Sequence, residues 1–249
     1  MLRWIALFVL IALPAKAEEV VAGMSQNRVQ ITTNFDGSEI LIFGAVKRET
    51  PLPEGPPLQV IITVEGPSSQ LTIRRKSKQF GIWVNSASVE VDEAPSFYAV
   101  TTSAPWRDTI KDIEDLRHKV SIDRAIRAVG LERSDAGDFV EALIRIRRGN
   151  DSYFNDFGGV EVSEETLFRA SVKLPANLTE GDYITRFFLT RGGEVIDTHQ
   201  SVIDVRKVGL EQFLFNLSRQ QPLIYGIMSL TIAIIAGWLA SAIFRWIRI

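Results

Sequence analysis

The sequence predicts a mainly β ectodomain, built as an immunoglobulin-like β-sandwich with an inserted helical segment, and one C-terminal transmembrane helix. Two observations predict the ectodomain: β-branched runs between Gly and Pro turns, and a stretch of helical period that interrupts them. A third, an uncharged run of 22 residues near the C-terminus, predicts the membrane helix. The 249 residues divide into a signal peptide (1–17), an N-terminal β-sandwich region (18–103), a helical segment (104–150), a C-terminal β-sandwich region (151–208), an amphipathic juxtamembrane stem (209–221), a transmembrane helix (222–244) and a cytoplasmic tail (245–249).

The N-terminus has the three parts of a secretory signal. Arg3 precedes an apolar run over residues 4–13, and Ala15 and Ala17 form a small-residue cleavage pattern before Glu18. The ten apolar residues are about half of the roughly 20 that a spanning helix needs. We therefore expect cleavage after Ala17, with an uncleaved anchor as the alternative.

Strand patterns dominate the first β region and return after the helical segment. The runs of the first region are separated by turn sequences rich in Gly and Pro, which is typical of a sandwich whose strand order stays open. The predicted strands are 29–32, 40–44, 59–64, 71–73, 82–84, 89–91, 97–100, 166–172, 183–189 and 200–205.

Between residues 106 and 148 the apolar period becomes helical. Ile110, Ile113 and Leu116 fall on one predicted face, and Ser121 is placed to cap the next short helix. We expect such amphipathic faces to pack on a sheet.

Local turn chemistry is clear in the second β region. Tyr183 follows a turn and is placed to anchor a sandwich corner, and Gly192 with Gly193 predicts a hairpin. Apolar residues at helical spacing over residues 210–217 predict a short amphipathic helix. It lies either at the membrane surface or against the last β region.

The uncharged run 223–244 follows Pro222, a favourable first helical residue, and is followed by Arg245, Trp246 and Arg248 as interfacial anchors. Combined with an export signal, this helix places residues 18–221 outside the cytoplasm and leaves a short cytoplasmic tail.

Small residues recur along the predicted membrane helix. Ala233, Gly237 and Ser241 are four residues apart, a spacing that permits close packing against a second copy or another membrane helix. A homo-oligomer and a hetero-oligomer are both left open.

Composition excludes several classes of function. Four of the 28 Lys and Arg residues lie in the two apolar ends, so residues 18–221 hold 24 against 30 Asp and Glu and carry a formal charge of −6. A nucleic-acid binder would usually be basic. The chain has no cysteine, and its two histidines, His118 and His199, have no paired spacing, so we expect no cofactor and no metal. His118 follows Glu114 and Asp115 by one helical turn. The three residues form either an exposed charge cluster or a group that transfers protons.

Two further stretches contain residue types that are typical of binding sites. The cations Arg74, Arg75 and Lys76, together with Trp83 and Trp106, form a candidate interaction surface for lipid headgroups or an acidic partner, although a hairpin tip also explains the cations. The stretch 151–159 combines oxygen ligands, aromatics and glycines, which fits an interdomain linker better than a calcium loop.

The segments 28–45, 81–85 and 94–100 resemble the alphaproteobacterial transmembrane protein family, and the likeness extends through 174–177 to the start of the anchor at 222–223. That family is defined by occurrence and topology, so the resemblance implies no catalytic residues. It implies a bacterial inner membrane, with the ectodomain in the periplasm, and a membrane partner such as a transporter of the sulfite-exporter type.

These observations favour an interaction or accessory protein, an auxiliary subunit of a membrane transporter or envelope complex, over an enzyme. The alternative is a periplasmic ligand-binding sensor or enzyme with a site between the two β-regions. A deep pocket lined with convergent polar groups would favour the alternative. A flat exposed patch around Trp83 or Trp106 would favour the interaction protein.

Overall fold

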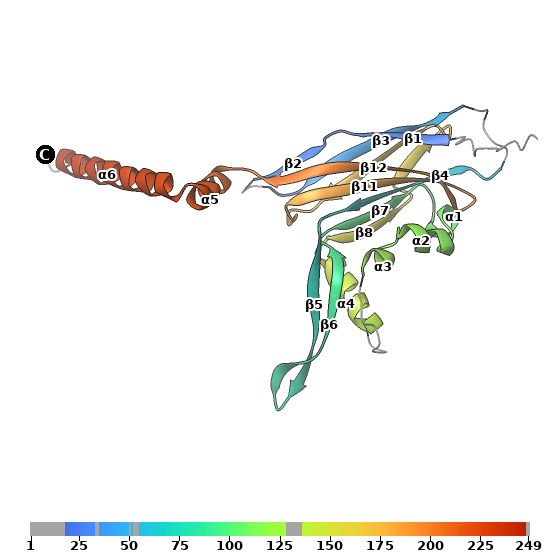
Figure 1. The fold of residues 1–249 in the computed structure, drawn as a ribbon, viewed down its shortest axis with the longest axis horizontal. Helices are drawn as coiled ribbons and strands as arrows, with labels where there is room; N and C mark the ends of the chain where they lie inside the picture. The colour runs from blue at the N-terminus through green and yellow to red at the C-terminus, as the bar shows by residue number, and fades with distance from the viewer. Residues whose placement is uncertain (1–17, 33–34, 50, 52–54, 128–135, 248–249) are drawn as a thin grey trace, which may run out of the picture.

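The computed structural model describes residues 18–32, 35–49, 51, 55–127 and 136–247, so the predicted signal peptide and residues 248–249 lie outside the described residues. Its strands form two sheets and a separate hairpin (Figure 1). The four-stranded sheet has the order β1 (Glu18–Met24), β3 (Ser38–Arg48), β10 (Leu167–Leu174) and β9 (Val160–Ser163). The six-stranded sheet has the order β2 (Arg28–Ile31), β12 (Glu194–Lys207), β11 (Gly181–Arg191), β4 (Leu58–Glu65), β7 (Tyr98–Thr102) and β8 (Tyr153–Phe157). The hairpin consists of β5 (Ser68–Gln79) and β6 (Ile82–Pro95).

The two sheets curl around one shared core. Strand β10 shows how the sequence produces it: Phe168, Ala170 and Val172 are buried, and the residues between them are exposed. Because side chains alternate between the faces of a strand, this pattern turns one face inward. There it meets residues of the six-stranded sheet such as Val60 and Phe187. The predicted mainly β class is confirmed.

The strands of the two predicted β regions are interleaved. Strand β3 pairs with β10, and β4 pairs with β11, so each sheet contains strands from both halves of the chain. The described strands therefore form one body rather than two successive sandwiches. Two pairs, β2 with β12 and β7 with β8, are parallel. This order confirms the β class without showing an immunoglobulin-like topology.

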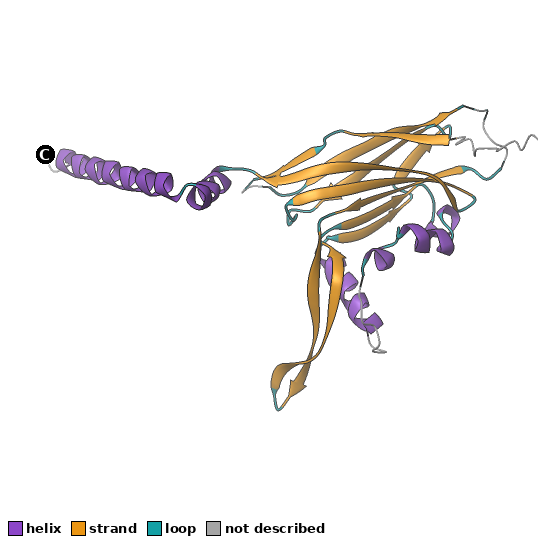
Figure 2. Cartoon of the chain, in the orientation of Figure 1, coloured by secondary structure: helices purple, strands orange, loops and turns teal. Residues whose placement is uncertain are grey.

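Helices cover the outer face of the six-stranded sheet over β4, β7, β8 and β11 (Figure 2), whereas Val202 on the outer face of β12 is exposed. Ile61, Val100 and Phe188 of that face are buried in a second core, together with helix residues such as Leu143. The helices are α1 (Trp106–Thr109), α2 (Asp112–His118), α3 (Ile122–Ala125) and α4 (Ala136–Gly149). The body thus has three layers where the helices lie, and no described helix covers the outer face of the four-stranded sheet.

The prediction that Ile110, Ile113 and Leu116 form one packed apolar helix face is wrong. Ile113 and Leu116 are exposed, and Ile110 is buried but lies outside the helix. The helix instead buries Glu114 and Asp115. The cause is hydrogen bonding, because the Asp115 carboxylate accepts the backbone N–H groups of the turn that follows, at residues 120 and 121. Ser121 donates its hydroxyl to Asp115 and makes no side-chain cap on α3.

The two turn predictions are confirmed. The Tyr183 hydroxyl donates to the Thr179 carbonyl at 2.9 Å, which closes the predicted corner. Arg191 pairs with Glu194 across the Gly192–Gly193 turn of the β11–β12 hairpin. The stretch expected to be a linker behaves differently, because residues 153–157 form β8 at an edge of the six-stranded sheet.

A buried ion network joins the two sheets at one end of the body. The Glu18 carboxylate at the start of β1 accepts from Arg48 Nε at 2.6 Å and from Arg191 Nη2 at 3.0 Å. Arg191 also contacts Glu165 Oε2 at 3.2 Å. Both arginines are nearly buried, so these charges are paired with one another in a place with little water.

The C-terminal helices extend away from the sheets (Figure 1). Helix α5 (Leu210–Gln220) packs on the start of α6 (Pro222–Ile247), with Phe213 and Phe215 exposed. Within the described residues, the segment Pro222–Arg245 is long and apolar enough to cross a membrane, and none of its residues is buried. The predicted span is therefore present as one continuous helix.

Candidate interaction surfaces

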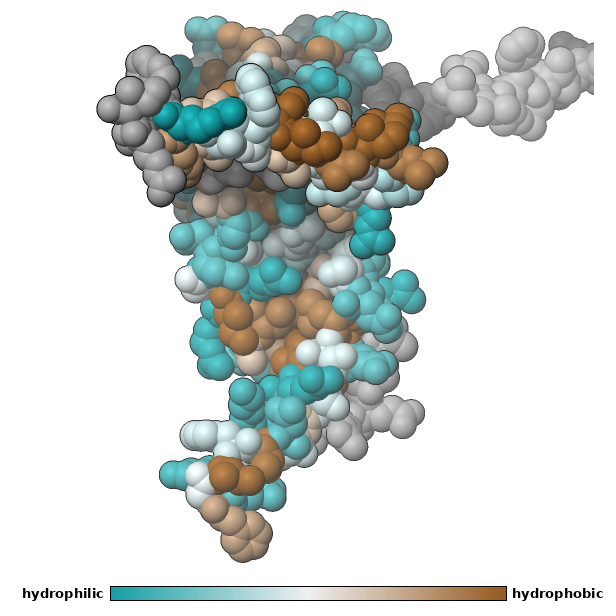
Figure 3. Space-filling model, turned by 90° about the vertical axis from the view of Figure 1, so that its left-hand side faces the viewer, coloured by the Kyte–Doolittle hydropathy of each residue, from teal (hydrophilic) through white to brown (hydrophobic). Residues whose placement is uncertain are grey.

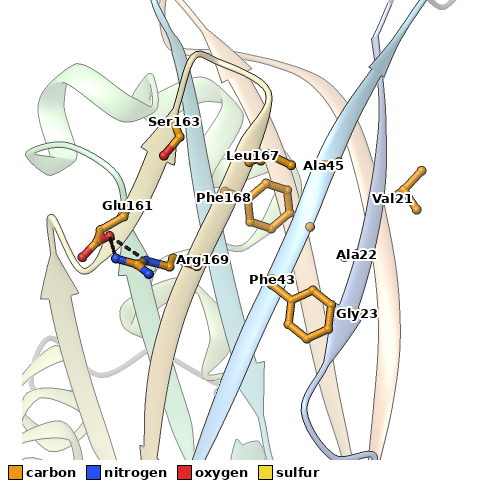
Figure 4. Close-up of a pocket in the computed structure, with 11 residues that line it drawn as sticks. Val21, Ala22, Gly23, Phe43, Ala45, Glu161, Ser163, Leu167, Phe168 and Arg169 are labelled. Atoms are coloured by element: carbon orange, nitrogen blue, oxygen red, sulfur yellow. Dashed lines mark hydrogen bonds and ion pairs between the residues drawn. The ribbon is translucent and has the colours of Figure 1, made fainter.

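A groove lies on the uncovered face of the four-stranded sheet (Figure 4). Its volume is about 720 Å³, and its lining comes from all four strands of this sheet. Three large apolar side chains dominate it: Val21 is 55% exposed, Phe43 47% and Leu167 57%. We call this surface the sheet groove. Leu41 is exposed on the same face of β3, two residues before Phe43.

Small residues create the hollow. Ala45 lies between Val21 and Leu167 in the register of the three strands, and Gly23 lies opposite Phe43. A Cβ on Gly23 would meet the Phe43 ring at 3.1 Å, so the glycine lets that ring lie over the strand. The result is an apolar floor between larger apolar side chains.

The charged groups of the sheet groove are already paired. Arg169 on β10 contacts the Glu161 carboxylate on β9 through Nη2 at 2.6 Å and through Nε at 2.7 Å (Figure 4). No other Asp, Glu, Lys, Arg or His is part of the described lining. The groove therefore offers apolar contact area rather than convergent groups for proton or group transfer.

The β5–β6 hairpin is a second exposed surface. Its base is fixed to the body, since Val91 and Ala94 are buried against residues such as Leu143 of α4. Its free end projects well beyond the helices, and hydrophobic residues reappear there below a hydrophilic band (Figure 3). We call Phe80, Ile82 and Trp83 the hairpin tip; they are 106%, 66% and 69% exposed.

The predicted interaction residues separate into two places. Arg74, Arg75, Lys76 and Trp83 lie on the outer part of the hairpin. Trp106 lies in α1, half-buried against the body, with its ring centroid 5.9 Å from that of Phe157. Arg75 is engaged with α4, where its guanidinium lies 4.6 Å from the Phe139 ring centroid and 3.5 Å from Asp138 Oδ2.

The side-chain contacts of His118 on α2 are those of a structural residue. His118 Nε2 lies 3.5 Å from Glu114 Oε2, and Arg117 binds the other oxygen of that carboxylate at 2.7 Å. The His118 ring packs edge-on against Phe188. In the part of the chain that the structure describes, no group of three or more His, Asp or Glu side chains is placed to hold a metal ion.

A polar cluster next to α2 holds the helix on the sheet. Arg186 of β11 donates to the carbonyls of His118 and Lys119 at 2.9 and 3.1 Å, and to the Tyr98 hydroxyl at 2.9 Å. Burial raises the pKa of Glu65 above its ordinary value, although Arg186 at 3.8 Å opposes the shift. Burial also raises the pKa of Tyr98. These contacts satisfy carbonyls at the C-terminus of α2 and give the cluster a packing role.

The small residues of the membrane helix are exposed. Ala233, Gly237 and Ser241 lie along one side of α6 by their four-residue spacing, and a Cβ on Gly237 would meet open space. Their role in helix packing stays a prediction.

Over the described residues, these features define a mainly β protein with one candidate membrane helix. The chain belongs to the family described as "Putative transmembrane protein (Alph_Pro_TM)", whose model matches residues 19–246, and the resemblance expected from the sequence is confirmed.

No curated protein matches the chain. Among solved structures the chain is similar to Spo0M, the sporulation control protein from Bacillus subtilis, at 13% identity and a TM-score of 0.28. That match covers 82% of this chain and 56% of the Spo0M chain.

Proposed function

We propose that this protein is a membrane-anchored periplasmic accessory subunit that binds a protein partner through the sheet groove. The observation that carries the proposal is the contrast between the sheets: helices cover one outer face over four of its six strands, and the other face exposes Val21, Leu41, Phe43 and Leu167. Contiguous apolar surface on a soluble body commonly marks a protein contact.

The membrane topology supports a subunit held beside a membrane partner. Helix α6 supplies the anchor, and the N-terminal signal pattern directs the β body to the periplasm, with the C-terminus in the cytoplasm. We also propose that the β body is related to immunoglobulin-like domains, a class that is common among adhesive proteins.

The partner proposed first is a membrane transporter of the sulfite-exporter type, which the family resemblance implies. A multi-helix partner could contact the chain twice. The sheet groove would bind its periplasmic part, and the Ala233, Gly237 and Ser241 side of α6 would pack against one of its helices. Such a pair of contacts would hold the body at a fixed height above the membrane.

A ligand-binding role has one observation in its favour. A hollow of about 550 Å³ lies between β8 and β10, and its lining includes Asp151, Asn155, Asp156, Ser171 and Lys173. These groups could hydrogen-bond a polar ligand. The hollow is the place to look if no protein partner is found.

The test is affinity purification of the tagged full-length protein from detergent-solubilised native membranes. We expect a stoichiometric partner with the parent chain, its loss with Phe43→Ser, and its retention with the control Ile113→Ser, an exposed apolar residue on α2. Gly237→Leu tests the contribution of α6 in the same experiment. Recovery of the parent chain alone, or a partner that survives Phe43→Ser, would contradict the proposal.

A further inference from the structure

We propose that the free end of the β5–β6 hairpin docks on an anionic lipid bilayer, with the hairpin tip in the interfacial layer. This is a second contact of the ectodomain, carried by residues other than those of the sheet groove. Two independent features of the hairpin support it: the residue types at its end and the charges along its stem.

The tip has the composition of an interfacial anchor. Phe80, Ile82 and Trp83 are exposed at the end of a two-stranded arm, where the described body offers them nothing to pack on. Aromatic side chains, and Trp above all, are enriched where apolar acyl chains meet polar headgroups. An arm that ends in Phe, Ile and Trp therefore fits a membrane interface.

The stem has the charge that an anionic surface attracts. Residues 74–89 hold four cations and no acidic residue. Because residues 18–221 carry −6 in total, the ectodomain without this segment carries −10. The cations are therefore concentrated on this arm of an acidic protein, and basic clusters of this kind bind the surface of anionic membranes.

Three of these cations are free to bind an anionic surface. The side chains of Arg74, Lys76 and Lys78 make no hydrogen bond or ion pair with any described residue, whereas Arg75 is bound by α4. The three alternate along β5 and so lie on one side of the strand, and Lys78 is directly opposite Trp83 in the hairpin register. Charge and aromatic anchor thus share one side of the arm.

The arm is tethered within reach of a bilayer. The twelve residues of β5 span roughly 40 Å, at about 3.3 Å per residue. The hairpin leaves the body at a steep angle to α6, and its tip leans toward the end from which α5 and α6 depart (Figure 1). Gly209 joins β12 to α5, and a rotation at this glycine would bring the tip to the membrane that holds α6. The tether also keeps the local concentration of lipid high.

The experiment uses the full-length chain in vesicles, where the absence of cysteine permits single-site labelling. An environment-sensitive fluorophore is placed at Gln79→Cys beside the tip, or at Gln200→Cys on β12 as the matched exposed control. The vesicles are phosphatidylcholine with or without phosphatidylglycerol, and a nitroxide lipid serves as quencher. We expect strong quenching at position 79 in the anionic vesicles and little at position 200.

Three variants sharpen the result. Replacing Arg74, Lys76 and Lys78 together by Gln removes the charge, and each lost cation should lower the ratio of docked to undocked hairpin about fivefold. Phe80→Ser with Trp83→Ser should abolish quenching while the far-ultraviolet circular dichroism of the body is unchanged. Phe43→Ser should leave quenching intact, so a failure of the sheet groove and a failure of the hairpin are distinguishable.

Equal quenching at positions 79 and 200 in anionic vesicles would overturn the proposal. So would quenching that is the same in neutral vesicles and with the Gln variant, because it would not depend on charge. A label at position 79 that is unquenched in lipid but cross-links to a protein in native membranes would assign the hairpin to a protein partner instead.

Discussion

The outer faces of the two sheets differ in what covers them rather than in how their strands are built. On the six-stranded sheet, Ile61, Val100 and Phe188 face outward and are buried by helices. On the four-stranded sheet, Leu41 and Phe43 face outward in the same alternating pattern and are exposed. An outward apolar row is therefore covered by helices on one sheet and exposed on the other.

The largest expected difference in unfolding free energy is between a residue that the helices cover and one on the exposed face. Ile61→Ala removes a fully buried side chain and should lower the free energy of unfolding by about 4 kcal/mol. Leu41→Ala on the open face should change it by less than about 0.5 kcal/mol. Denaturation in detergent, followed by tryptophan fluorescence, measures both. Equal losses would show that the open face is packed in the isolated protein.

The second prediction compares the stability lost when a buried and an exposed ion pair are broken. Arg191→Gln removes one partner of the buried Glu18 carboxylate and should cost about 3 kcal/mol, the lower end for such pairs because Arg48 still binds Glu18. Arg169→Gln on the open face breaks an exposed pair and should cost less than about 1 kcal/mol. The same denaturation experiment tests this pair, and a larger loss for the Arg169 variant would reverse the assignment.

A smaller effect concerns the corner that orients β11 between the two layers. Tyr183→Phe keeps the buried ring and removes only the hydrogen bond to the Thr179 carbonyl, so we expect a loss of about 1 kcal/mol. Thermal unfolding of the variant measures it. No change would mean that water replaces the hydroxyl at this corner.

The smallest effect is a pH dependence on the covered side. Because the folded pKa of Glu65 is raised by burial, its ionisation costs stability, and that cost is absent below the ordinary pKa and grows as pH rises through the raised value. Glu65→Gln should therefore gain stability relative to the parent as the pH rises above 4.5, the ordinary pKa of this carboxyl.

Glu194 gives the matched control for Glu65. Its pKa is lowered by a hydrogen bond from Lys111, so the parent loses that contribution as the pH falls through the lowered value, and Glu194→Gln should show the opposite slope. Slopes of the same sign for the two variants would contradict the assignment.

The sequence predicts the local features of this molecule well. The runs at 40–44 and 59–64 lie in strands, the Gly192–Gly193 hairpin forms, and Tyr183 anchors its corner, since each depends on neighbouring residues alone. Strand partners depend on contacts between distant residues, and no local pattern shows that β3 would pair with β10 rather than with another strand of its own half.

The candidate surfaces were predicted less completely. Basic residues and Trp83 indicated the hairpin, but Phe80, at its end, was not singled out. The sheet groove was missed because Val21, Phe43 and Leu167 come from three separate strands and look like core residues in the sequence. On α2, hydrogen bonds to Asp115 overrode the apolar spacing of Ile113 and Leu116.

Site-specific photo-cross-linking in native membranes tests the central claim most directly. A photoreactive phenylalanine analogue at Phe43 reports on the sheet groove, and the same analogue at Ile113 reports on an exposed apolar residue of the covered side. The account predicts a discrete cross-linked protein product at position 43 and none at position 113. No product at position 43, or the same product at both positions, would contradict it.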